Sequence, residues 1–121
     1  MNAALTEKMY RAFPYLYRGR TKPQDESAMC YGFECGDGWY QILYDLSQEL
    51  TGHMLLHPFL DLELMQVKSK FGTLRFHLNY SDSSTEEIIS RARRRADLVC
   101  EVNSKTKHAS DPLKYKGEKL K

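Results

Sequence analysis

Residues 62–80 carry the strongest strand pattern in the chain, as two alternating segments joined by Phe71 and Gly72. Apolar and polar side chains alternate through both segments, which is typical of strands that bury one face. The apolar positions include Met65, Val67, Leu74, Phe76, Leu78 and Tyr80. Gly72 tolerates the positive φ that a tight turn requires. The pattern therefore predicts a β-hairpin over this range.

The segments before the hairpin predict two helices and one further strand. Residues 3–12 have helical spacing, and Phe13-Pro14 ends that helix because a residue before proline avoids helical backbone angles. Residues 29–35 alternate as a strand does. Residues 39–50 again have helical spacing, and Gly52 is well placed to end this second helix.

A last helix follows the hairpin, and Ser84 with Glu87 matches the capping box that begins many helices. Its core side is expected to carry Ile89, Ala92, Ala96 and Val99. The resulting order, α-β-α-β-β-α, indicates an α+β fold in which a small antiparallel sheet of about three strands packs against helices. We expect one domain over residues 1–102.

Charge is distributed unevenly, which the net charge of +2 conceals. Residues 103–121 hold six lysines against Asp111 and Glu118, whereas residues 1–102 hold 12 basic and 14 acidic side chains. The last segment contains few large apolar side chains that could offset the entropy cost of ordering it. We expect it to be a flexible basic tail, with a solubilising role favoured over a nucleic-acid-binding arm.

Composition excludes several classes of protein. No apolar run approaches the roughly 20 residues of a membrane-spanning helix, and the first residues lack the pattern of a secretory signal. Three cysteines are too few for a disulfide scaffold and suit a reducing compartment. A length of 121 residues fits one modest core. We therefore expect neither a membrane protein, nor a secreted miniprotein, nor a large multidomain enzyme.

Two groups of residues could bind a metal or act in catalysis, and each also has a simpler structural explanation. The spacings of Cys30 with Cys35 and of His53 with His57 fall in the range of structural zinc sites. However, the two cysteines should point to opposite faces of a strand. Glu34 and Asp37 are neighbouring acids without an identifiable base, and Asp37 is expected to cap the helix whose Trp39 fills the core. The sequence thus favours no metal, no cofactor and no catalytic residue.

Basic and aromatic residues form the better-supported candidate site for binding a partner. One group is the arginines of the last helix, Arg91, Arg93, Arg94 and Arg95. A second lies on the polar side of the hairpin and comprises Lys68, Lys70, Arg75 and His77. A third lies in the long loop over residues 14–27 and comprises Tyr15, Tyr17 and Arg18. Clustered arginines repel one another, so an acidic protein surface or nucleic acid would relieve their repulsion. The alternative is a solvated surface with helical ion pairs such as Glu87 with Arg91.

Three stretches together resemble a family of small proteins that bacteriophages and prophages encode and that have no assigned activity. Residues 30–40 read CYGFECGDGWY, residues 67–76 read VKSKFGTLRF, and residues 100–102 read CEV. Many relatives in that family continue as Cys-Glu-x-Cys-Gly, whereas Asn103 and Ser104 follow Val102 here. The resemblance implies a viral origin and the host cytoplasm, and it brings no catalytic residues.

Three hypotheses about function follow. The first is a non-enzymatic phage protein that binds and inhibits a bacterial nucleoprotein defence complex, as anti-CRISPR and other anti-defence proteins do. The second is direct nucleic-acid binding through the arginines of the last helix and the hairpin lysines. The third is a small metal-dependent hydrolase centred on Glu34, Asp37 and the histidines.

Overall fold

The computed structural model describes residues 1–103 and 105, so most of the expected basic tail lies outside the described residues. Three helices, α1 (Ala3–Ala12), α2 (Tyr40–Leu56) and α3 (Ser83–Asp97), combine with three strands, β1 (Phe33–Glu34), β2 (Leu64–Lys70) and β3 (Thr73–Leu78). Their order along the chain is α-β-α-β-β-α. The structure thus confirms the predicted α+β fold with a small sheet.

The sheet is mixed, whereas the sequence predicted antiparallel pairing. The strand order is β1-β2-β3, with β1 parallel to β2 and β2 antiparallel to β3. Helix α2 connects β1 to β2, which allows the chain to return in the same direction.

The predicted strand over residues 29–35 is largely wrong. Residues Ala28–Tyr31 form a short 3-10 helix, which begins where the Ser27 side chain accepts a hydrogen bond from the Met29 backbone N–H. Gly32 ends this turn at a φ of +71°. The chain then becomes extended only at Phe33 and Glu34.

The hairpin confirms the prediction for residues 62–80 in its essential part. Val67 pairs with Phe76, and Lys68 pairs with Arg75. Val67, Leu74 and Phe76 are buried, whereas Arg75 is exposed. The strands meet at a turn in which both Phe71 and Gly72 have positive φ, of 55° and 78°.

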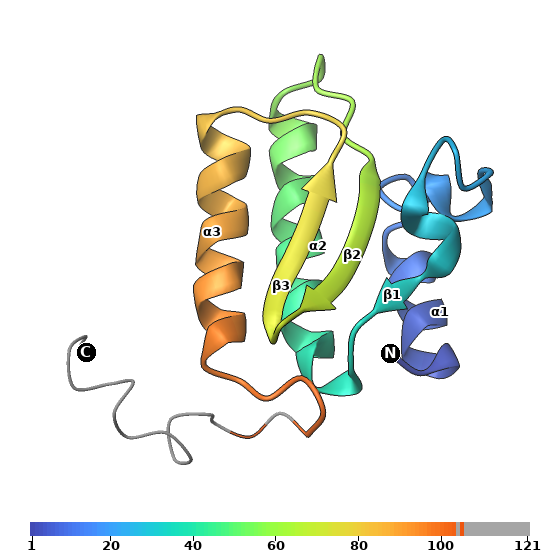
Figure 1. Cartoon of the computed structure of the whole chain (residues 1–121). Helices are drawn as coiled ribbons and strands as arrows, with labels where there is room; N and C mark the ends of the chain where they lie inside the picture. Colours follow the sequence, from blue (N-terminus) through green and yellow to red (C-terminus); the bar gives the residue numbers. More distant parts are fainter. Residues whose placement is uncertain (104, 106–121) are drawn as a thin grey trace.

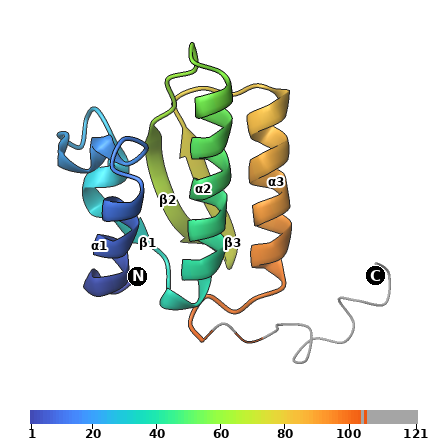
Figure 2. The same ribbon diagram turned by 180° about the vertical axis from the view of Figure 1, so that it is seen from behind.

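Helices α2 and α3 form one layer against one face of the sheet. The hairpin lies in front of α2 in Figure 1 and behind it in Figure 2, and α3 stands beside α2 next to β3 in both views. The core between the two layers includes Trp39, Leu43, Leu46, Leu50, Val67, Phe76, Ile88 and Ala92. Within the described part of the chain, the opposite face of the hairpin therefore carries no helix.

Both helix boundaries predicted near the hairpin need correction. Helix α2 continues past Gly52 to Leu56. Helix α3 begins with a capping box of Asp82 and Thr85 in place of Ser84 and Glu87, because Asp82 Oδ1 accepts from the Thr85 N–H at 2.8 Å. Ile88 occupies the core, while Ile89, which the sequence placed there, is half-buried.

The segment after α3 crosses the turn that leads into α2. The Gly36 N–H donates to Glu101 Oε1 at 2.9 Å, and the Gly38 N–H donates to the Glu101 carbonyl oxygen at 2.5 Å. The second carboxylate oxygen of Glu101 accepts from Ser69 Oγ at 2.5 Å. This clasp joins residues of all three stretches singled out in the sequence.

Glycine is required at the clasp for a steric reason. A Cβ atom on Gly36 would lie 2.3 Å from the Glu101 carbonyl oxygen, and one on Gly38 would lie 2.3 Å from that of Cys100.

Trp39 is fully buried, as predicted, and its Nε1–H donates to the Val99 carbonyl oxygen at 2.9 Å. Asp37 does not cap the helix; it accepts from the N–H of Asn2 at 2.6 Å.

Among residues 1–103 and 105, no helix combines the length and the apolar character needed to cross a membrane.

Candidate functional site

Two of the arginines on α3 face helix α2 and are neutralised there. Arg91 Nη2 lies 2.6 Å from Glu49 Oε2, and Arg95 Nη1 lies 2.8 Å from Asp45 Oδ2. The hydrogen bond from Arg95 holds the pKa of the Asp45 carboxyl below its ordinary value. These ion pairs link the two helices, so Arg91 and Arg95 contribute less to an anion-binding surface than the sequence suggested.

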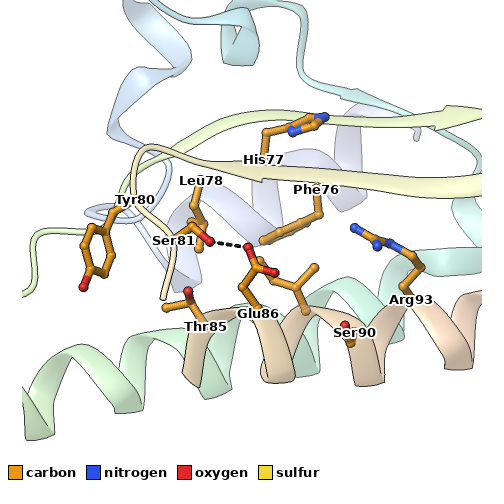
Figure 3. A pocket seen from close by; sticks show the side chains of 10 residues that line it. Phe76, His77, Leu78, Tyr80, Ser81, Thr85, Glu86, Ser90 and Arg93 are labelled. Carbon is orange, nitrogen blue, oxygen red and sulfur yellow. Dashed lines mark hydrogen bonds between the residues drawn. The ribbon is translucent and has the colours of Figure 1, made fainter. Parts of the chain in front are cut away.

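The other two arginines of α3 are less engaged. Arg94 lies 3.9 Å from Glu87, at the edge of ion-pair distance. Arg93 is exposed and has no salt bridge to any described residue. It lies beside a groove between β3 and α3, toward which Phe76 and Leu78 point, while His77 points to the opposite side (Figure 3). The predicted four-arginine cluster is therefore divided between two sides of α3.

The loop over residues 14–27 is held against α2 and against residues 61–62 before β2 by the residues proposed to contact a partner. Tyr17 is fully buried and its hydroxyl lies 2.7 Å from Ser47 Oγ, so the expectation that it is a surface anchor is wrong. Arg18 donates to the Leu62 carbonyl oxygen at 2.8 Å and pairs with Asp61 at 3.1 Å. Tyr15 is exposed, stacks under the Arg18 guanidinium and also bonds to Asp61.

The predicted group on the hairpin lies on the face of the sheet that α2 and α3 leave uncovered. We call it the cationic sheet face, and it comprises Lys68, Lys70, Arg75 and His77. Lys70, Arg75 and His77 are exposed and Lys68 is half-buried. Within the part of the chain that the structure describes, neither lysine nor Arg75 forms a salt bridge.

Two of these cations stand directly opposite each other. Lys68 and Arg75 are cross-strand neighbours, an arrangement that destabilises a sheet when the charges are alike. Glu34 is the neighbour of Lys68 on the other side, and its side chain interacts with Gln66 at 3.5 Å. The face therefore presents more positive charge than its acidic neighbour offsets.

The residues considered for metal binding or catalysis are not assembled into a site. Across residues 1–103 and 105, no three or more histidine, cysteine or acidic side chains gather as metal ligands would. The rings of His53 and His57 stack with centroids 4.4 Å apart, and Cys30 is exposed. Burial raises the pKa of the Cys35 thiol to about 11, which disfavours the reactive thiolate.

Two surface features were missed by the sequence interpretation. Leu55, Leu56 and Phe59 are exposed around the end of α2, although nothing in their spacing distinguishes them from core residues. Phe71, assigned only to the turn, is 95% exposed and has a positive φ. The signal for Phe71 was its place directly before Gly72 in a two-residue turn, where asparagine or aspartate is usual.

The fold and this surface define a small α+β protein with a cationic sheet face. Comparison with known proteins finds no matching family model, no matching curated protein and no matching solved structure.

Proposed function

We propose that this chain is a non-enzymatic bacteriophage protein that works in the host cytoplasm by binding a bacterial nucleoprotein defence complex. On this proposal it blocks the use of nucleic acid by that complex, as inhibitors of the anti-CRISPR type do. The cationic sheet face supports the proposal most directly. Its lysines and Arg75 form no salt bridge to a described residue, and no described helix covers this side of the hairpin.

The positive charges on the cationic sheet face are better explained by binding of an anionic partner than by a contribution to the stability of the fold. Like charges at directly opposite positions of two strands are unfavourable, and Lys68 and Arg75 occupy such positions. An anionic partner would turn this unfavourable placement into a favourable one. By contrast, the arginines that support the fold, Arg91 and Arg95, each have a carboxylate on α2. The contrast separates structural cations from cations that are available for contact.

Expression of the chain in a bacterium with a nucleoprotein defence system tests the proposal. We expect phage plating to rise on the defended host and to stay unchanged on an otherwise identical host without the system. The purified chain should also comigrate with the purified, guide-loaded complex in size-exclusion chromatography. Unchanged plating on every defended host, together with no comigration, would contradict the proposal.

A further inference from the structure

We propose that the hairpin tip is a stacking platform for an unpaired base, and that the cationic sheet face binds the phosphates of the same single strand. This inference rests on the proposed function and names the part of the nucleoprotein complex that is contacted. It commits to single-stranded nucleic acid as the ligand.

The backbone at Phe71 gives the first reason. Phe71 has a φ of 55° and Gly72 has a φ of 78°. Glycine adopts such angles freely, but a bulky side chain in this region is strained. Strained residues of this kind concentrate at functional sites, where the local cost is retained for another purpose.

Exposure of the Phe71 side chain gives the second reason. The ring is 95% exposed, so core burial does not compensate for the strained backbone. Neither turn preference nor burial therefore favours phenylalanine at this position. An aromatic ring held away from the sheet by a tight turn can instead stack on a planar group.

The adjacent charges indicate what kind of planar group this is. Lys70 directly precedes Phe71, Lys68 lies two residues earlier on β2, and Arg75 lies opposite Lys68 on β3. Residues two apart on a strand point to the same face and lie about 6.6 Å apart. Lys68 and Lys70 thus form a row that leads to the ring. Cations that track a backbone beside an aromatic ring are the usual elements of single-strand binding.

Single strands fit this arrangement better than a duplex or an acidic protein. Bases of a duplex stack on one another and are not accessible to a ring at a hairpin tip, whereas unpaired bases are. An acidic protein surface would pair with the lysines, but a planar ring at the end of a row of cations matches a base that is followed by phosphates more closely. The combination of Phe71 with the cations therefore favours an unpaired strand.

Fluorescence anisotropy of the full chain with a labelled oligothymidine of about 12 nucleotides tests the inference. Phe71→Asn is the decisive variant, because asparagine accepts positive φ and removes the ring. We expect this variant to unfold at a higher temperature than the wild type and yet to bind roughly tenfold more weakly. A merely structural role of Phe71 would move stability and binding in the same direction.

Matched controls separate the ring and the charges from general effects. Phe59→Ala removes an aromatic side chain that is equally exposed, and it should leave affinity unchanged. Lys70→Glu/Arg75→Glu should reduce the slope of log affinity against log salt by about 1.4, as expected for two lost phosphate contacts on a single strand. A duplex of equal length should bind more weakly than the single strand.

The inference is overturned if the wild type does not bind the oligothymidine at about 50 mM salt. It is also overturned if Phe71→Asn binds like the wild type, or if the duplex binds as tightly as the single strand. Should any of these occur while the chain still inhibits the defence complex, the proposed function stands without this inference. Conversely, if binding of the oligothymidine depends on Phe71 but the chain does not raise phage plating on any defended host, the proposed function is contradicted and this inference stands.

Discussion

Substitution of Trp39 by alanine is expected to lower the free energy of unfolding by about 3–5 kcal/mol. Trp39 is fully buried at the start of α2, so the variant leaves a large cavity between the two layers. It also removes the donor that reaches the Val99 carbonyl oxygen at 2.9 Å. Because a domain of this size is stable by only about 5–15 kcal/mol, a large part of its stability is lost.

Urea denaturation followed by circular dichroism measures this effect. Trp39→Phe is a useful companion variant, because it restores most of the apolar volume but not the N–H donor. We expect Trp39→Phe to fall between the wild type and Trp39→Ala. If Trp39→Ala unfolds at the wild-type urea concentration but no longer inhibits a defence complex, Trp39 is a contact residue and its assignment to the core is wrong.

Replacement of Gly38 by alanine is expected to destabilise the chain by about 1–3 kcal/mol, as overpacking does. The new Cβ would lie 2.3 Å from the Cys100 carbonyl oxygen, and that atom belongs to backbone that cannot simply rotate away. The clasp between the Gly36–Gly38 turn and Glu101 must then open or shift. The midpoint of urea unfolding reports the loss.

Gly52→Ala provides the matched control for Gly38→Ala. Gly52 lies within α2, and, apart from its chain neighbours and the adjacent backbone of the helix itself, nothing lies within 4 Å of the position that a Cβ would occupy. Alanine at an open helical site stabilises by about 0.5–1 kcal/mol. The same substitution should therefore lower the free energy of unfolding at Gly38 and raise it at Gly52. Destabilisation of equal size at both would contradict the steric explanation of the clasp.

The parts of the fold that local patterns determine were predictable from sequence. The hairpin follows from side-chain alternation and a Phe71-Gly72 turn, and both are properties of neighbouring residues. The strand expected over residues 29–35 was wrong because the side chain of Ser27 and the positive φ of Gly32 form a helical turn inside an alternating pattern. Alternation alone does not detect such competing local bonds.

The candidate site depended on contacts between residues that are distant in sequence. The carboxylate partners of Arg91 and Arg95 lie on α2, 42 and 50 residues away in the sequence. No local sequence pattern shows that α2 packs beside α3. Tyr17 illustrates the same limit, since its burial depends on Ser47 and on aromatic rings from other segments. The cations of the hairpin were placed correctly on the polar side because strand alternation alone determines their direction.

The clasp also gives a structural account of the three stretches over residues 30–40, 67–76 and 100–102. Gly36, Gly38, Ser69 and Glu101 meet through hydrogen bonds that close the fold. None of these bonds implies catalysis. In this chain the stretches are therefore explained by the scaffold, and the function is proposed for the surface beside it.

We propose that this protein acts through contact made by the cationic sheet face. The most direct measurement compares Lys70→Glu/Arg75→Glu with Lys8→Glu/Lys105→Glu, an equal change of charge at exposed positions elsewhere, in the plating assay on a defended host. We predict that the first variant loses inhibition and keeps its melting temperature, since the carboxylate that replaces the Arg75 guanidinium would oppose Lys68 favourably. The second variant should inhibit like the wild type. Equal inhibition by both variants would contradict the account.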